Sequence, residues 1–242
     1  MCESNSKTNF SKMVALVFKK TSITLLAIAV VFNAKSQGEM FIKNQGQVVD
    51  QDGNFNQTVL FIYSGRKYNV AFYKDHFTYE VFQVCDPEGG KYNAQRIELW
   101  YSKPNKDIQI SPLELYNTNM NFYKNGCSFL NVSGCHKLVY ENVWDGIDIE
   151  FIIEENRLKY DFIVSEKAKN SFSIVAKGAE MSKANDGINL ICEDFLIHEK
   201  IPFSFIYSNG TKDIYKELTT KVRHNKLTYL LPINRNGKVI ID

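Results

Sequence analysis

The sequence lacks the short motifs by which many enzyme classes are identified. It has no glycine-rich phosphate loop, no dinucleotide-binding fingerprint and no G-x-S-x-G nucleophile motif. Histidine is scarce, and the four that occur lie in strand-like runs: His76, His136, His198 and His224. These absences argue against a nucleotide-dependent enzyme and against a Ser/His or Cys/His hydrolase. Each histidine is expected to be a packing or edge residue.

A long apolar run is also missing. The apolar stretch near the N-terminus covers residues 23–32, fewer than the about 20 residues that a membrane-spanning helix needs. It follows a segment with four lysines and one glutamate, and it precedes Ala34-Lys35-Ser36, whose small residues suit a signal peptidase. The pattern predicts a secretory signal peptide over residues 1–36, cleaved before Gln37. An uncleaved N-terminal anchor is the alternative, and Met13 is an alternative start.

The small positive charge of the chain comes from this segment. The whole sequence has 29 Lys and Arg and 27 Asp and Glu, for a formal net charge of +2. Without residues 1–36, which hold five lysines and one glutamate, 24 basic and 26 acidic residues remain, a net charge of about −2. No basic stripe then remains to follow a phosphate backbone. Nucleic acid is not expected as a partner, and the mature chain is expected to have no transmembrane span.

Cysteine is infrequent, and four of the five follow the signal segment: Cys85, Cys127, Cys135 and Cys192. In an oxidising compartment four cysteines allow two disulfides in three connectivities, which the sequence does not distinguish. Cys127 and Cys135 are close enough in the chain to close a short loop, so they are the favoured disulfide candidates. The alternative is that all four are buried thiols. A metal role for Cys127, Cys135 and His136 is poorly supported, because this spacing fits no usual zinc site.

From residue 39 onward the dominant hydrophobic period is two, which is typical of β-strands. Turn signals such as Asp186-Gly187, Asn209-Gly210 and Asn236-Gly237 separate the apolar runs. The expected strands cover residues 59–63, 68–73, 77–84, 97–101, 108–110, 115–122, 137–143, 172–176, 188–192, 195–198, 203–207, 215–222, 227–232 and 239–241, together with the two strands of a central hairpin. This pattern predicts an all-β fold, an antiparallel β-sandwich or barrel-like unit. One domain is expected over residues 37–242, with two β subdomains divided near 103–107 as the alternative.

The clearest signal lies in the central hairpin, residues 140–164, where two runs of alternating apolar residues flank a short polar turn. If Ile153 lies opposite Leu158, the apolar residues of both runs share one face. The remaining pairs are then Phe151 with Tyr160, Ile149 with Phe162, and Ile147 with Val164. A slip by one residue would move one strand's apolar set to the other face, so burial specifies this register strongly.

The same stretch carries a family resemblance. VWDGIDIEFIIEENRLKYDFIV resembles the centre of a domain of unknown function in secreted surface proteins, typically of gliding bacteria with type IX secretion. The opening FIKNQGQ at 41–47, NMNFY at 119–123 and the closing VIID at 239–242 resemble further parts of that domain, in the same order. The resemblance covers residues 39–242 and implies a domain without an established activity. In such proteins it precedes β-propeller-like repeats, PKD modules and a sorting domain.

Three carboxylates share the polar face of the predicted hairpin. In the register above Glu150 lies opposite Asp161, and Asp148 lies two residues before Glu150. Like charges opposite one another on a sheet are unfavourable, so some compensation is expected. A weakly bound Ca²⁺ would supply it, which makes the three acids a candidate calcium site, the only cofactor considered. Lys159, next to Asp161 along the strand on the same face, offers the simpler structural alternative.

The function expected from these features is that of a secreted or cell-envelope β module with a structural or adhesion role and no catalysis. Its location would be the periplasm, the cell surface or the extracellular space, and its partners would be envelope proteins or surface glycans. Aromatic residues in its strands are expected mainly in the core rather than on a binding platform. Two alternatives stay open. One is a carbohydrate-active enzyme that uses a pair of these carboxylates; the other is a truncated remnant of a larger surface protein, because the chain stops at Asp242.

Overall fold

The computed structural model consists of β-strands, turns and loops wherever it is described. The structure describes residues 40–50, 52–65, 67–86, 91–124, 126–193, 195–200, 203–208, 211–231 and 238–241. The signal peptide predicted over residues 1–36, the side chain of Cys85 and the turns predicted at 209–210 and 236–237 lie outside the described residues. Within them no helix occurs. Nothing in the described part of the chain is therefore a helix able to span a membrane.

The strands of the described residues are each antiparallel to their neighbours. In chain order they are β1 (Phe41–Lys43), β2 (Phe61–Ser64), β3 (Tyr68–Phe72), β4 (His76–Asp86), β5 (Lys91–Tyr101), β6 (Gln109–Leu115), β7 (Met120–Lys124), β8 (Cys127–Val132), β9 (Gly134–Trp144), β10 (Ile147–Glu154), β11 (Arg157–Val164), β12 (Ser171–Lys177), β13 (Glu180–Lys183), β14 (Gly187–Cys192), β15 (Phe195–Lys200), β16 (Phe203–Ser208), β17 (Thr211–Glu217), β18 (Thr219–Arg223), β19 (Lys226–Leu230) and β20 (Lys238–Ile241).

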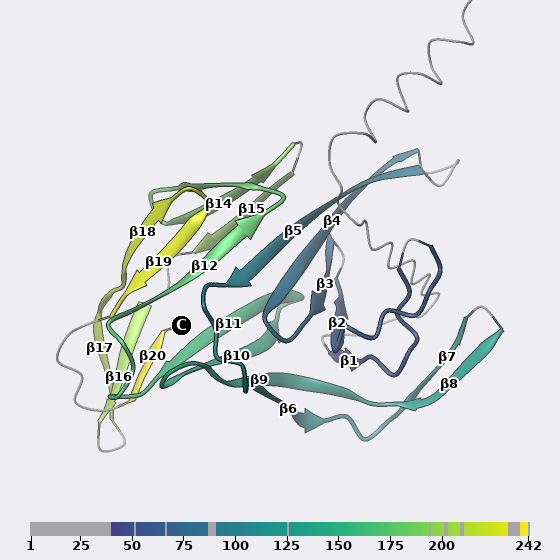
Figure 1. The fold of residues 1–242 in the computed structure, drawn as a ribbon, viewed down its shortest axis with the longest axis horizontal. Coiled ribbons are helices and arrows are strands. Elements are labelled where there is room, and N and C mark those ends of the chain that lie inside the picture. Colours follow the sequence, from purple (N-terminus) through teal and green to yellow (C-terminus); the bar gives the residue numbers. More distant parts are fainter. Residues whose placement is uncertain are drawn as a thin grey trace, which may run out of the picture.

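One large sheet contains 15 of these strands (Figure 1). Its order is β17-β16-β20-β11-β10-β9-β1-β2-β3-β4-β5-β12-β19-β18, with β6 paired to β9 beside this path. The remaining strands form the three-stranded sheet β13-β14-β15 and the hairpin β7-β8. The predicted all-β antiparallel fold is confirmed, and the sheet is not closed into a barrel. Its end strands β17 and β18 follow one another in the chain, but the described pairing does not join them.

The register predicted for the central hairpin is confirmed. β10 and β11 pair Ile153 with Leu158, Phe151 with Tyr160, Ile149 with Phe162, and Ile147 with Val164. The two turn residues, Glu155 and Asn156, have φ values of 50° and 61°. Two consecutive positive φ values are those of a type I′ turn, whose twist matches the right-handed twist of the flanking strands. Local turn geometry and burial therefore specify the same register.

The large sheet folds back on itself around one aromatic core. Phe151 is completely buried, and its ring centroid lies 5.1 Å from that of Phe72 and 5.3 Å from those of Phe77 and Tyr140. All three contacts are edge-to-face, an arrangement that the quadrupoles of aromatic rings favour. Strands β10 and β11 thus face β3 and β4 across a shared interior.

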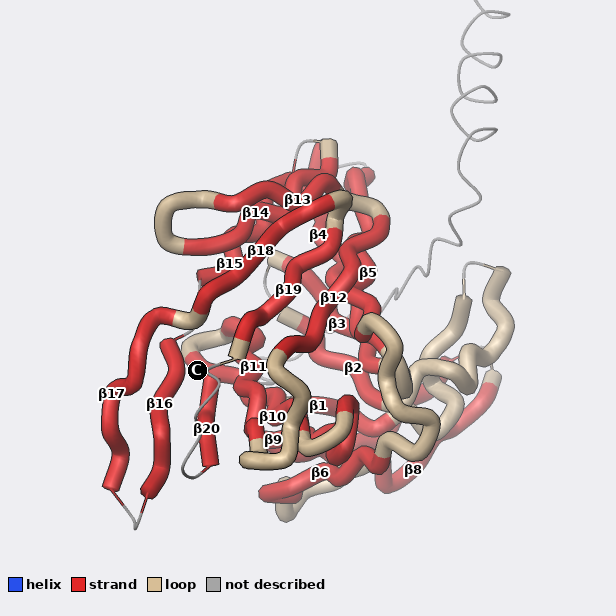
Figure 2. Tube along the Cα trace, turned by 60° about the vertical axis from the view of Figure 1, so that its left-hand side comes forward, coloured by secondary structure: helices blue, strands red, loops and turns tan. Residues whose placement is uncertain are grey.

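The three-stranded sheet forms a second layer over part of this interior. It contacts β5, β12 and β18, and Figure 2 shows it stacked beside β12, β18 and β19. Met181, Ile188 and Leu190 are buried from this layer into the same core as Phe151. The described structure is therefore a sandwich in which the folded large sheet supplies most of both faces.

The loop at 103–107, considered as a domain boundary, connects β5 to β6. Core residues come from both sides of it, with Phe77 and Tyr101 before it and Phe151 after it. The backbone N–H of Asn105 donates a hydrogen bond to the carbonyl of Val143, 2.9 Å away, which ties the loop to the end of β9. That residues 37–242 unfold as one domain stays a prediction.

Two predicted strands are divided in the structure. The strand expected over 115–122 is split between β6 and β7, because residues 116–119 lie opposite only Ser133 and Gly134 in the ladder. The strand expected over 215–222 is interrupted at the buried Leu218, where the chain passes from one end of the large sheet to the other. Strands β1, β8 and β13 have no counterpart among the expected strands. The three or four residues of β1 and β13 carry little periodic signal, and β8 covers a segment that was expected to be a loop.

Phe151→Ala is expected to lower the free energy of unfolding by about 3–5 kcal/mol, because it leaves a cavity among rings that cannot fully collapse into it. The matched control, Leu196→Ala, removes a side chain that is 62% exposed and should change stability by about 0.5 kcal/mol or less. Urea unfolding followed by circular dichroism measures both. Equal losses for the two variants would contradict the central position of Phe151.

Candidate functional site

The carboxylates of the hairpin's polar face are each engaged by a neighbouring group. Glu150 lies opposite Asp161, as predicted, and Glu150 Oε1 is 2.7 Å from Lys137 Nζ on β9. Lys159 Nζ lies 3.8 Å from Asp161 Oδ1, so the predicted screening by this lysine is present as well. The hydrogen bond from Lys137 to Glu150 raises the pKa of the lysine, which keeps its ammonium charged. The repulsion across the hairpin is thus offset by two lysines.

The structure does not assemble the predicted calcium site from Asp148, Glu150 and Asp161. Asp148 Oδ1 accepts a hydrogen bond from the backbone N–H of Asn142 at 2.7 Å, within a β-bulge where Asn142 has a φ of 58°. The other two acids face lysines, and no group of three or more His, Cys, Asp or Glu among the described residues is arranged to hold a metal ion. Lys137 was the compensating charge that sequence analysis did not identify, because its strand pairing depends on the fold.

The disulfide favoured between Cys127 and Cys135 is not formed in the structure. Both are free, Cys127 exposed at the start of β8 and Cys135 buried in β9. The chain between them is almost continuously extended and would span about 26 Å if straight. A disulfide requires Cα atoms within about 7 Å of one another. The prediction treated this segment as a loop, whereas it continues from one strand into the next.

A carboxyl group that sequence analysis did not identify lies between the two layers. Glu199 Oε1 on β15 accepts a hydrogen bond from Tyr79 Oη on β4 at 2.9 Å, and Tyr160 on β11 is also hydrogen-bonded to this carboxyl group. Tyr160 is in turn hydrogen-bonded to Tyr229 on β19. Tyr79 and Tyr229 are buried. This Glu199–tyrosine network connects the three-stranded sheet to three strands of the large sheet.

Burial controls the protonation of the network. It raises the pKa of Glu199 above the ordinary glutamate value, while the hydrogen bonds from Tyr79 and Tyr160 and the nearby His198 act in the opposite direction. Burial also raises the pKa values of Tyr79, Tyr160 and Tyr229, so all three hydroxyls are neutral hydrogen-bond donors at neutral pH. The network therefore holds one ionisable acid among neutral phenols.

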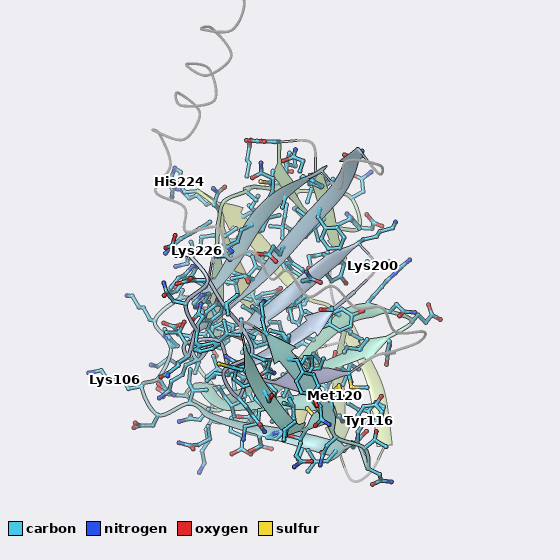
Figure 3. The ribbon with its side chains drawn as sticks, turned by 90° about the vertical axis from the view of Figure 1, so that its right-hand side faces the viewer. Lys106, Tyr116, Met120, Lys200, His224 and Lys226 are labelled. Atoms are coloured by element: carbon cyan, nitrogen blue, oxygen red, sulfur yellow. The ribbon has the colours of Figure 1, made fainter. Side chains whose placement is uncertain are left out.

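The alternation of β15 explains how the sequence places Glu199 there. Phe195, Ile197 and Glu199 occupy the less exposed positions of the strand, and the residues between them are exposed. Lys200 is labelled in Figure 3, where it lies at the periphery of the molecule. An acid at an apolar position of a period-two run was the signal that could have identified this residue. Its partners could not be predicted, because they come from distant strands.

The opening segment, residues 41–47, anchors the loop between β1 and β2. This loop covers the outer face of β1, β2 and β3. Asn44 Nδ2 donates hydrogen bonds of 2.8 Å to the carbonyls of Asn56 and Val59, and Asn44 Oδ1 accepts one from the N–H of Gly46 at 2.9 Å. Gly46 has a φ of 115°, and a Cβ at this position would lie 2.9 Å from the ring of Phe129. Asparagine and glycine are therefore needed here for loop structure.

Strands β6 to β9 form one long, bent ribbon. The N–H of Tyr116 donates to the carbonyl of Gly134 at 2.9 Å, and Met120 then pairs with Val132, so the pairing of β6 with β9 continues into β7 and β8. Figure 3 shows Tyr116 and Met120 at the same end of the molecule. Figure 1 shows the distal end of the ribbon, residues 120–132 and here called the arm, extending away from the large sheet.

The arm is packed on one face and exposed on the other. Phe122 and Phe129 pair across it, and the ring centroid of Phe129 lies 5.5 Å from that of Phe55, in the loop between β1 and β2. On the opposite face Tyr123 is 73% exposed and Leu130 is 52% exposed. Because Tyr123 pairs with Ser128, two residues before Leu130, both side chains emerge on the same side. This face is the largest departure from the expectation that aromatic residues are buried.

The fold and these sites define an all-β domain with a folded antiparallel sheet, a buried acid and an exposed ribbon arm. Residues 41–242 match the model of a family described as a domain of unknown function, DUF7948. The chain belongs to this family. The match begins at the first residue of β1 and extends past the end of β20. No curated protein and no solved structure matches the chain.

The pairing of Lys137 with Glu150 is expected to contribute less than about 1 kcal/mol, because both side chains are about a quarter exposed. A double-mutant cycle of Lys137→Met and Glu150→Gln measures this coupling, which should decrease further in high salt. Excess Ca²⁺ should leave the midpoint of thermal unfolding unchanged. A Ca²⁺-dependent rise that Glu150→Gln and Asp161→Asn both abolish would contradict compensation by the lysines.

Proposed function

We propose that this chain is a non-catalytic β module of an exported bacterial envelope protein, and that it binds a protein partner through its arm. The observation that carries the proposal is the exposure of Tyr123 and Leu130 on one face of the arm. Water solvates such apolar surface unfavourably, and contiguous exposed apolar groups are typical of interaction surfaces. The packed opposite face, with Phe129 against Phe55, gives the arm a defined position from which to present them.

The chemistry of the surface favours a protein over a glycan. Tyrosine is enriched at protein interfaces, where its ring supplies area and its hydroxyl a hydrogen bond. Leu113 and Leu115 on β6 are 44% and 60% exposed, and β6 pairs only with β9 among the described strands. Aliphatic side chains beside an open strand edge suit an apolar protein surface, whereas sugar binding relies on aromatic faces. Glycan binding is a distinct outcome of the test below.

Export is supported by the predicted signal peptide over residues 1–36 and by the resemblance to secreted surface proteins. A role at the periplasm or cell surface follows from both. Cell fractionation checks it directly, since recovery of the mature chain in the cytoplasm would contradict the proposal.

The environment of the hairpin acids supports a role without catalysis. A glycosidase needs one carboxyl group that donates a proton and a second that is free to act as nucleophile or base. Glu150 is instead paired with Lys137 at 2.7 Å, and Asp148 accepts the backbone hydrogen bond of Asn142. These contacts occupy the acids that the alternative carbohydrate-active enzyme would use.

The arm is tested with the double variant Tyr123→Ser/Leu130→Ser and the control Leu196→Ser, which changes a comparably exposed leucine on the three-stranded sheet. Binding of each purified chain to an envelope fraction is measured by sedimentation. The arm variant is expected to bind at least tenfold more weakly than the unchanged chain, because the apolar contact is lost, and the control should bind normally.

Treatment of the envelope fraction with protease distinguishes a protein partner from a glycan partner. Loss of binding after this treatment supports a protein partner. Binding that survives protease and is competed by purified surface glycan would replace the proposal with glycan adhesion. Equal binding by the arm variant and the unchanged chain, with unaltered thermal unfolding of both, would contradict a role for the arm.

A further inference from the structure

Glu199 lies in an apolar and phenolic part of the contact between the three-stranded sheet and the large sheet. At the exposed margin of the same contact, Glu193 accepts a hydrogen bond from Gln95 of β5. Met181, Ile188 and Leu190 supply the apolar part of this contact. At the open side of β15, Glu199 reaches Tyr79 and the hydrogen-bonded Tyr160. Since β15 pairs only with β14 among the described strands, this carboxyl group is the polar attachment of an edge strand to the layer beneath it.

The titratable groups around Glu199 lie on four strands of the large sheet and on its own strand, β15. Tyr79 on β4 and Tyr160 on β11 donate to the carboxyl group, while Tyr68 on β3 is packed edge-to-face against Tyr79 at 5.2 Å. Tyr229 on β19 is hydrogen-bonded to Tyr160. The positively chargeable group that acts on Glu199 is His198, the preceding residue of its own strand.

Both ring nitrogens of His198 contact groups other than Glu199. Its Nδ1 atom lies 2.8 Å from Asn189 Oδ1 and its Nε2 atom lies 3.3 Å from Asp186 Oδ1. Asn189 lies opposite His198 in the ladder of β14 and β15, so these contacts belong to the exposed side of the layer. An ionised Glu199 would therefore face phenol hydroxyls from the large sheet, while the side chain of His198 lies on the other side of the strand.

We propose that Glu199 makes the contact between the two layers pH-sensitive, so that β13, β14 and β15 pack closely on the large sheet while the carboxyl group is protonated and open more readily once it is ionised. The open layer would solvate the carboxylate and expose Tyr79 and Tyr160. In a module exported as proposed above, this response would expose Tyr79 and Tyr160 when the external pH rises. The central hairpin would stay unchanged. The response acts independently of the arm and of its partner.

The direction of the effect follows from the raised pKa of Glu199. Between the ordinary glutamate pKa, about 4.5, and the raised value, the closed layer binds more protons at this site than the open layer does. The stabilisation of the closed layer is therefore complete below about pH 4.5 and is lost as the pH rises through the folded-state pKa. Release of one proton limits the effect to about a tenfold change in the opening equilibrium per pH unit.

Hydrogen exchange of the purified chain, followed by mass spectrometry from about pH 5 to about pH 8, tests the proposal. After correction for the intrinsic pH dependence of exchange, peptides from β13, β14 and β15 should show an opening equilibrium that rises with pH, and peptides from β10 and β11 should not. Glu199→Gln should remove this rise, because the amide has the same shape but no titration. The control Glu180→Gln, an exposed acid on β13 of the same layer, should keep it.

Tyr79→Phe provides a second variant that keeps the ring and removes one hydrogen bond to the carboxylate. Since that hydrogen bond lowers the pKa of Glu199, its loss should shift the pH range of opening upward. A carbon-13 titration of the Glu199 carboxyl measures the same shift independently of stability. Equal pH dependence in the unchanged chain and in Glu199→Gln would overturn the proposal. A rise spread equally over all strands would overturn it as well, since that result reports global unfolding.

Discussion

The pairing of β10 with β11 is the constraint on which the rest of the structure depends. The register that joins Phe151 to Tyr160 places the apolar residues of both strands on one face, and the type I′ turn at Glu155 and Asn156 favours the same register. β9 pairs along one side of this hairpin and β20 along the other. A slip by one residue would remove Phe151 from Phe72 and Phe77, and the large sheet would lose the contact around which it folds.

The polar groups divide into those that stabilise this arrangement and those that give it a function. Lys137 and Lys159 offset the acids of the hairpin's outer face, and Asn44 fastens the loop beneath the arm. Glu199 differs from them, because its carboxyl group lies between layers and its charge opposes burial. Together with the exposed arm and the buried pair of Glu80 with Arg96, it departs from the rule that apolar groups are buried and charged groups are exposed.

Strand alternation and turn chemistry predicted the class of fold and the hairpin register, because both are local properties of the chain. They also placed Glu150 opposite Asp161. The Glu199–tyrosine network could not be predicted, since Tyr79 and Glu199 meet only after two layers stack. The disulfide between Cys127 and Cys135 was wrongly favoured because closeness in sequence was taken as closeness in space, whereas the chain between them is extended. The function of the chain depends on its exposed surfaces, and the period-two pattern of its strands does not specify which partners bind to them.

The central claim is that both layers share one core organised by the β10–β11 hairpin. Urea unfolding followed in parallel by far-ultraviolet circular dichroism and by tryptophan fluorescence tests it most directly. Trp144 reports on the core, because it packs against Phe172 with ring centroids 4.9 Å apart, and the second tryptophan, Trp100 on β5, stacks on His76. A shared core predicts that the two transitions coincide at a pH where Glu199 is protonated. Separate transitions, with strand structure persisting after the tryptophan signal is lost, would show independent units and contradict the claim.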